Sequence, residues 1–194
     1  MRIFLLSIVL ILSLQSSMKA DNIEDFQIMG MAIGESLLNY YKEDEILNTN
    51  IMYYPNSKKF YQIAFLVEGN LYDALNINLK KDDKKYNIYA IKGVKDYDNK
   101  LAKCIKHKTN VIKDVMNILK NTKENKGETD WDGYYGQSIS YQSGFEINNG
   151  SIFINCIKWD KNNDTVKSAE WVDTFNVEVS TNEWRDWLNL EAYN

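Results

Sequence analysis

Six stretches of the chain carry patterns typical of strands, in which apolar residues recur at every second position or aromatic and β-branched residues are concentrated. The stretches are Phe60–Val67, Leu75–Leu79, Tyr86–Val94, Ile139–Ile147, Ile152–Cys156 and Phe175–Val179. Gly69-Asn70 and the charged run Lys80–Lys85 separate the first three stretches, and both are typical of exposed turns. Because the connections are short, neighbouring strands are expected to pair antiparallel.

The stretch Ile139–Ile147 and the stretch after it predict a second hairpin. Asn149-Gly150 lies between them, and this dipeptide favours a two-residue type I′ turn. A loop made of these two residues predicts three opposed pairs, Ile147–Ile152, Phe145–Ile154 and Ser143–Cys156.

Helical spacing of apolar residues predicts helices in three places. One or two short helices are expected over 34–48, and a long helix over 99–122. Ser180 and Glu183 form a predicted capping box for a terminal helix whose apolar face is Trp184, Trp187 and Leu188. The fold class is therefore α+β, an antiparallel sheet of about six strands with helices packed on one face.

The N-terminus carries an apolar run, Ile3–Leu14, preceded by Arg2. Twelve residues are too few to span a bilayer, which needs about 20, but they match the apolar region of a secretory signal peptide. We predict a signal peptide over 1–20, cleaved after Ala20, and a single domain over 21–194. Cleavage near Ser16 or Ser17, or retention as an anchor, is the alternative. The expected location is the periplasm or the exterior, with no membrane span after cleavage.

The charge balance argues against nucleic acid as a partner. Without Arg2 and Lys19, the 23 basic residues fall to 21, against 27 acidic residues. A net-acidic chain without a basic stripe does not favour binding to phosphate backbones or anionic membranes.

The two cysteines, Cys104 and Cys156, are predicted to form a disulfide, because an even pair in a secreted chain is most simply a bridge. A four-ligand zinc site is not favoured with His107 as the only histidine, and no C-x-x-C redox motif is present. Cys104 falls on the apolar stripe of the long helix and should face the sheet. His107 falls off that stripe and is predicted to be exposed.

Four segments carry a resemblance to a known group of proteins. They are Gly30–Leu38 (GMAIGESLL), Cys104, Cys156–Asp160 (CIKWD) and Thr181–Trp187 (TNEWRDW). Together they resemble an uncharacterised family of small exported proteins of AT-rich marine bacteria. The resemblance spans most of the mature chain and implies export and a bacterial origin, and it brings no activity or site residue with it.

The segment Gly127–Gln137 (GETDWDGYYGQ) is predicted to be a loop that could carry function. Glu128, Asp130 and Asp132 match the first half of a calcium loop, but Ile139 stands where the final bidentate glutamate belongs. We therefore predict no metal and no cofactor.

The same loop holds Trp131, Tyr134 and Tyr135, which are the predicted binding residues. Aromatic side chains on a loop can stack on a saccharide or anchor a protein partner, or they can fold down onto the core. Trp159 and Trp171, at the ends of strands, are interpreted as core or rim.

No motif of a known catalytic class is present, and no catalytic residue is predicted. The favoured function is a non-enzymatic binding or envelope-accessory module whose partner is an unknown protein or a saccharide. The alternative is a small hydrolase using paired carboxylates, such as Asp130 with Asp132 or Asp160 with Asp164.

Overall fold

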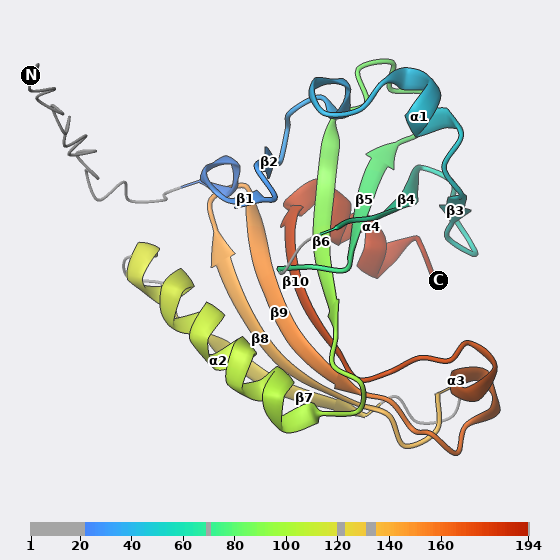
Figure 1. The fold of residues 1–194 in the computed structure, drawn as a ribbon. Helices are drawn as coiled ribbons and strands as arrows, with labels where there is room; N and C mark the ends of the chain where they lie inside the picture. Colours follow the sequence, from blue (N-terminus) through green and yellow to red (C-terminus); the bar gives the residue numbers. More distant parts are fainter. Residues whose placement is uncertain (1–21, 69–70, 120–122, 131–134, 194) are drawn as a thin grey trace, which may run out of the picture.

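The computed structural model describes residues 22–68, 71–119, 123–130 and 135–193. Over these residues the chain forms an eight-stranded antiparallel sheet in the order β3-β4-β5-β6-β10-β9-β8-β7, and a separate pair, β1-β2 (Figure 1). The strands are β1 (Gln27–Ile28), β2 (Met31–Ala32), β3 (Ile51–Tyr53), β4 (Phe60–Leu66), β5 (Ala74–Lys80), β6 (Ile88–Asp96), β7 (Asn125–Asp130), β8 (Ile139–Ile147), β9 (Gly150–Lys158) and β10 (Thr174–Thr181). The helices are α1 (Glu43–Leu47), α2 (Leu101–Ile118), α3 (Asp164–Ser168) and α4 (Asn182–Leu190), with 3-10 turns η1 (Ile23–Asp25) and η2 (Leu37–Asn39).

The α+β class is confirmed, but the sheet is larger than the predicted six strands because its two edge strands carry no clear alternation. β3 has three residues, all exposed. β7 reads NKGETD and has no apolar residue. It includes residues 127–130, so the prediction that the whole of 127–137 is a loop is wrong over its first four residues. The predicted signal peptide, residues 1–20, lies outside the described residues.

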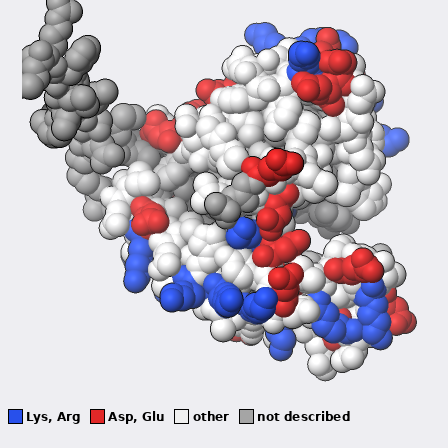
Figure 2. All heavy atoms as spheres, viewed as in Figure 1, with Lys and Arg blue, Asp and Glu red and all other residues white. Residues whose placement is uncertain are grey.

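One face of the sheet is covered by α2 and the N-terminal segment. The centre of this face is a row of apolar residues that stand directly opposite one another on neighbouring strands: Ile63, Ile77, Ile91, Val179, Ile152 and Phe145. All six are at most 3% exposed. α2 packs over β9 and β10, and N-terminal residues such as Ile33 and Leu37 belong to the same core. Lysines such as Lys103 and Lys106 are exposed on α2, and basic side chains gather along this helix in Figure 2.

α4 lies on the opposite face, so the expectation that all helices pack on one face is wrong. Strand residues alternate between faces, and Ala90, the neighbour of Ile91, belongs to a second core with Trp184 and Trp187 of α4. Ala90, Ser180 and Ser151 stand opposite one another across β6, β10 and β9 and are fully buried. These small side chains leave room for α4 at this end of the sheet.

The cap of α4 differs from the prediction by one residue. Thr181 is the N-cap, and its hydroxyl oxygen accepts a hydrogen bond from the amide of Trp184 at 3.1 Å. Ser180 cannot take this role because its side chain points into the sheet face beside Ser151. Glu183 instead accepts a hydrogen bond from Lys80 Nζ at 2.8 Å.

The β8–β9 hairpin is present, but its register differs from the prediction. Ile147 pairs with Gly150, and Phe145 with Ile152, so the loop is Asn148-Asn149. Gly150 therefore lies in the strand rather than in the turn, at a position where a Cβ would collide with the Ser180 carbonyl oxygen and with Ile23. The shift is an even number of residues, so every side chain keeps its predicted face.

Gly150→Ala should lower the free energy of unfolding by about 1–3 kcal/mol, the usual cost of overpacking. A Cβ at this position would collide with the Ser180 carbonyl oxygen and with Ile23, and backbone cannot move aside cheaply. Gly144→Ala in the partner strand is the control, because a Cβ there meets nothing within 4 Å. Urea denaturation measures both. Equal stabilities of the two variants would contradict the packing argument.

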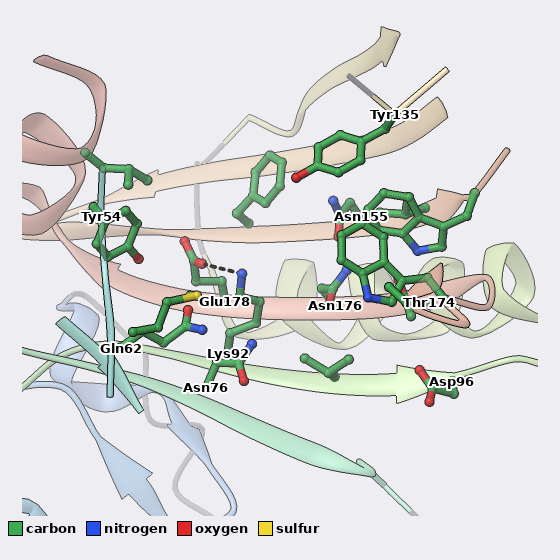
Figure 3. A pocket seen from close by; sticks show the side chains of 18 of the residues that line it. Tyr54, Gln62, Asn76, Lys92, Asp96, Tyr135, Asn155, Thr174, Asn176 and Glu178 are labelled. Carbon is green, nitrogen blue, oxygen red and sulfur yellow. Dashed lines mark hydrogen bonds and ion pairs between the residues drawn. The ribbon is translucent and has the colours of Figure 1, made fainter. Parts of the chain in front are cut away.

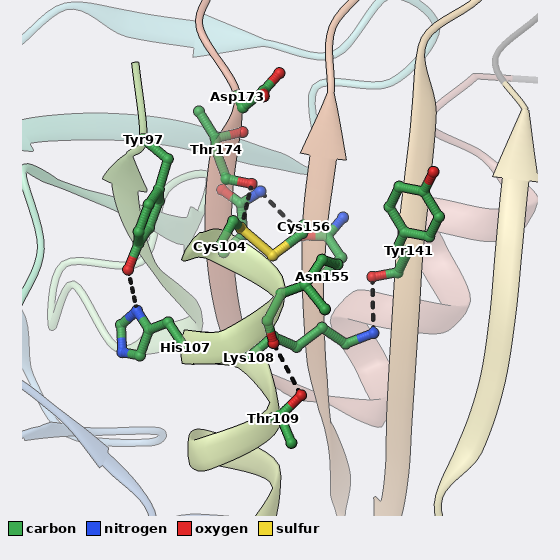
Figure 4. Close-up of a disulfide and its surroundings, with 12 residues drawn as sticks. Tyr97, Cys104, His107, Lys108, Thr109, Tyr141, Asn155, Cys156, Asp173 and Thr174 are labelled. Atoms are coloured by element: carbon green, nitrogen blue, oxygen red, sulfur yellow. Dashed lines mark hydrogen bonds between the residues drawn. A yellow bond between two sulfur atoms is a disulfide. The ribbon is translucent and has the colours of Figure 1, made fainter. Parts of the chain in front are cut away.

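The predicted Cys104–Cys156 disulfide is confirmed, with an S–S distance of 1.98 Å and Cα atoms 6.0 Å apart. It joins α2 to β9 through the middle of the core, and both cysteines are fully buried (Figure 4). Because of the register shift, the residue opposite Cys156 is Tyr141 rather than Ser143.

His107, predicted to be exposed, is half-buried beside this bridge. Its ring stacks on Phe175 with ring centroids 4.4 Å apart, and its Nδ1 lies 2.6 Å from the Tyr97 hydroxyl (Figure 4). Burial, and then the nearby charge of Lys95, lowers the pKa of His107. The side chain is therefore part of the packing between α2 and β10.

Candidate functional site

A groove of about 1120 Å³ lies on the α4 face of the sheet. α4 and Tyr193 form one end, and the segment 159–172, which contains α3, forms the other. The floor consists of β6, β10 and β9, with β5 and β4 beyond them (Figure 3). The groove exists because both covering segments pack over the ends of the same sheet face and leave its middle open.

Two rows of opposed residues make the floor. The first runs Asn76, Lys92, Glu178, Phe153 across β5, β6, β10 and β9. The second runs Val94, Asn176, Asn155 across β6, β10 and β9. With strands about 4.8 Å apart, the first row spans about 14 Å.

The polar groups at the centre of the floor are held in fixed positions by one another. Lys92 Nζ lies 3.6 Å from Glu178 Oε2, and the Glu178 side chain is only 11% exposed. Asn176 Nδ2 donates to Asn155 Oδ1 at 2.9 Å. Asn155 Nδ2 in turn donates to the Ser140 hydroxyl at 2.8 Å. A buried network of this kind fixes the orientation of each amide.

Other polar atoms on the floor are left open. Among the described residues, the side-chain amides of Gln62 and Asn76 form no hydrogen bond, and Asn176 Oδ1 accepts none. Gln62 and Asn76 are half-buried, and each amide lines the groove with donor and acceptor capacity that no other described residue uses.

Three aromatic rings form the wall at the α3 end. Trp159 and Trp171 have ring centroids 4.5 Å apart and are tilted by 47°. Tyr135 contacts both, at 5.6 Å from Trp159 and 5.4 Å from Trp171. All three are half-buried and line the groove. We call this set the aromatic cluster.

The α4 end carries a second group of aromatic residues. Tyr54 packs edge-on against Trp187 at 5.0 Å and against Tyr193 at 5.7 Å. Its hydroxyl donates to Asn78 Oδ1 at 2.8 Å. Burial raises the pKa of Tyr54 strongly, and Tyr193 and Glu178 raise it further. Tyr54 therefore stays a neutral phenol at ordinary pH.

The structure describes only one of the three predicted binding residues. Tyr135 lies in the aromatic cluster, whereas Trp131 and Tyr134 lie outside the described residues. Sequence reasoning assigned Trp159 and Trp171 to core or rim and did not single out the polar floor. The available signal was the alternation of Thr174, Asn176 and Glu178 along β10, which marks a polar face without showing that it is covered at both ends.

The acidic residues weighed as a hydrolytic pair are engaged elsewhere. The Asp160 carboxylate accepts from the amides of Gln137 at 3.0 Å and Asn162 at 2.9 Å. These two bonds lower the pKa of Asp160, which does not suit a general acid. Asp164 pairs with Lys167 at 3.9 Å. The side chain of Asp130 and the whole of Asp132 lie outside what the structure describes.

Glu128, from the half calcium motif, lies on β7 opposite Tyr141. Within the described ranges, no group of three His, Cys, Asp or Glu side chains is placed to hold a metal ion.

Comparison with family models, with curated proteins and with solved structures found no match. In the described part of the chain, no helix has the length and apolar character that a membrane span requires.

Proposed function

We propose that the protein is a non-enzymatic binding module that holds a small-molecule ligand in the groove on the α4 face of its sheet. The observation that carries this proposal is the groove itself, which combines aromatic walls at both ends with a floor of oriented and partly unused polar groups. Ligand sites are typically concave, mostly apolar, and supplied with a few placed polar groups.

The spacing of Glu178 and Asp96 does not suit a hydrolytic pair of carboxylates. Glu178 and Asp96 both line the groove, but Asp96 stands opposite Thr174, four residues from Glu178 along β10. Four residues of strand extend about 13 Å. Paired hydrolytic carboxyls are usually about 5–9.5 Å apart. Glu178 is also paired with Lys92, which suits a fixed polar contact.

The disulfide supports the proposed location. A buried bridge between α2 and β9 is stable in an oxidising compartment such as the periplasm or the cell exterior. It also holds β9, one of the three central floor strands, against the helix behind it. A floor braced in this way needs little rearrangement on binding, which favours affinity.

Fragment binding followed by NMR tests the proposed function. Mature, disulfide-bonded protein labelled with ¹⁵N is mixed with a library of small water-soluble fragments of varied chemistry. We expect amide signals of groove residues on β6, β9 and β10 to shift, together with the indole signals of Trp159 and Trp171.

Two variants control the location of the site. Val94→Trp fills the middle of the groove and should abolish the shifts, because Val94 is a half-buried floor residue. Tyr53→Trp places the same side chain on an exposed position of β3 outside the groove and should leave the shifts unchanged. No shifts in the wild type, or equal shifts in Val94→Trp, would refute a groove ligand.

A further inference from the structure

Resting on the proposed function, we propose that the ligand is a neutral oligosaccharide. One sugar ring stacks against the aromatic cluster, and the hydroxyls of the following rings bond to the side-chain amides of the floor. Three independent properties of the groove support this class of ligand: the balance of its charges, the spacing of its open amides, and the geometry of its aromatic wall.

The charges of the groove do not favour a charged ligand. Its two basic lining residues both have acidic partners, Lys92 with Glu178 at 3.6 Å and Arg185 with Glu146 at 3.8 Å. Asp96 and Glu170 line the groove as additional acidic groups. An anionic ligand such as a phosphate ester would meet two cations that each already lie within 4 Å of a carboxylate, and Asp96 and Glu170 would repel it.

The open amides suit a chain of hydroxyl groups. An amide side chain both donates and accepts hydrogen bonds, as a hydroxyl does. Gln62, Asn76 and Asn176 stand on β4, β5 and β10, so their strands cover about 14 Å of the floor. Polar groups distributed over that distance match an extended ligand with hydroxyls along its length better than a ligand with one polar end.

The aromatic cluster suits the apolar face of a sugar ring. The face of an aromatic ring carries a partial negative charge and attracts C–H groups, which cover one face of many pyranoses. Trp159 and Trp171 are tilted by 47° with centroids 4.5 Å apart, and Tyr135 completes the wall. These half-buried rings line the groove and are held by one another, so they need little ordering on binding.

Two other elongated ligands fit the floor less well. A peptide strand could not extend the sheet here, because the backbones of β6, β10 and β9 are already paired on both sides. An acyl chain would cover Gln62, Asn76 and the Lys92–Glu178 pair, and would strip water from polar groups without replacing its hydrogen bonds.

Calorimetric titration with defined probes tests the inference. Cellotetraose, maltotetraose and chitotetraose are titrated into the mature protein, with dodecylphosphocholine and a neutral tetrapeptide as comparators. We expect at least one tetrasaccharide to bind and both comparators to fail. Trp171→Ala should weaken that binding about tenfold through loss of stacking. Tyr53→Ala, an exposed tyrosine outside the groove, should not change it.

A second variant keeps the test valid if Trp171→Ala unfolds the protein. Gln62→Leu removes an amide that forms no hydrogen bond within the described protein, so the melting temperature should not change. Binding should weaken about threefold to tenfold through loss of one hydrogen bond. Gln142→Leu on β8 is the matched control, since Gln142 is half-buried and does not line the groove.

The outcomes separate this inference from the proposed function. If no tetrasaccharide binds while fragments or dodecylphosphocholine still shift groove signals, the saccharide is wrong and the binding module stands. Saccharide binding that Gln62→Leu and Trp171→Ala leave unchanged would also overturn the inference. If nothing shifts the groove signals, both proposals fail.

Discussion

Replacing both Cys104 and Cys156 by alanine is expected to lower the free energy of unfolding by about 4 kcal/mol. The bridge closes a loop with a sequence separation of 52 residues, and on the chain-entropy model a loop of that size contributes about this much. Both side chains are fully buried, so their loss also removes packing between α2 and β9. Urea denaturation of the oxidised wild type and the double variant measures the difference.

The wild type with its bridge reduced separates the crosslink from the packing. Reduction keeps both sulfur atoms in the core and removes only the covalent bond. Its stability should therefore lie near that of the double variant, and slightly above it. A loss below about 1 kcal/mol on reduction would show that the bridge contributes little to stability.

Trp187→Ala should destabilise the protein by about 3–5 kcal/mol, the usual cost of removing a large buried aromatic side chain. Trp187 is 2% exposed and is the anchor of α4 on the sheet. Its ring lies 4.9 Å from Phe60 and 5.0 Å from Tyr54, and its indole nitrogen donates to Ser57 at 2.9 Å. Thermal and urea unfolding followed by circular dichroism give the change.

Leu190→Ala in the same helix is the control. Leu190 is 72% exposed, so its truncation should change the stability by no more than about 0.5 kcal/mol. A small effect of Trp187→Ala would mean that α4 is not held by this side chain. In that case the α4 end of the groove would need another anchor.

The central strands could be predicted because each carries a complete local pattern. β10, for example, alternates Phe175, Val177 and Val179 with polar residues, and all three apolar side chains are buried in the main core. The sheet face on which each side chain lies was predictable even where the register of the two strands was not. The β8–β9 pairing differs by an even number of residues, and the disulfide partners were therefore placed on the correct face.

The missed features depend on contacts between segments far apart in the chain. The space at Gly150 is set by Ser180 and Ile23, so no local turn signal could fix the register. His107 lies off the apolar stripe of α2, but Phe175 and Tyr97 provide a partner for its ring. β7 has no apolar residue and forms a strand because it pairs with β8.

The candidate site was hidden for the same reason. In the sequence, the polar positions Asn176, Glu178 and Lys92 look like those of an ordinary solvent-facing strand surface. Nothing near them indicates that other segments pack over this face. The groove appears only when α4 and the segment 159–172 settle over the two ends of that face. Tyr135 was singled out from its loop, but its ring partners Trp159 and Trp171 come from the ends of other strands.

The place of β10 in the sheet has a consequence for the order in which the molecule is assembled. β10 is the last strand along the chain, yet it lies between β6 and β9 (Figure 1). A growing chain can pair β3 to β6 and, separately, β7 to β9, because those partners are neighbours in sequence. The two half-sheets are joined only when residues 174–181 arrive. The groove straddles that joint, so it is complete only once β10 has paired with both β6 and β9.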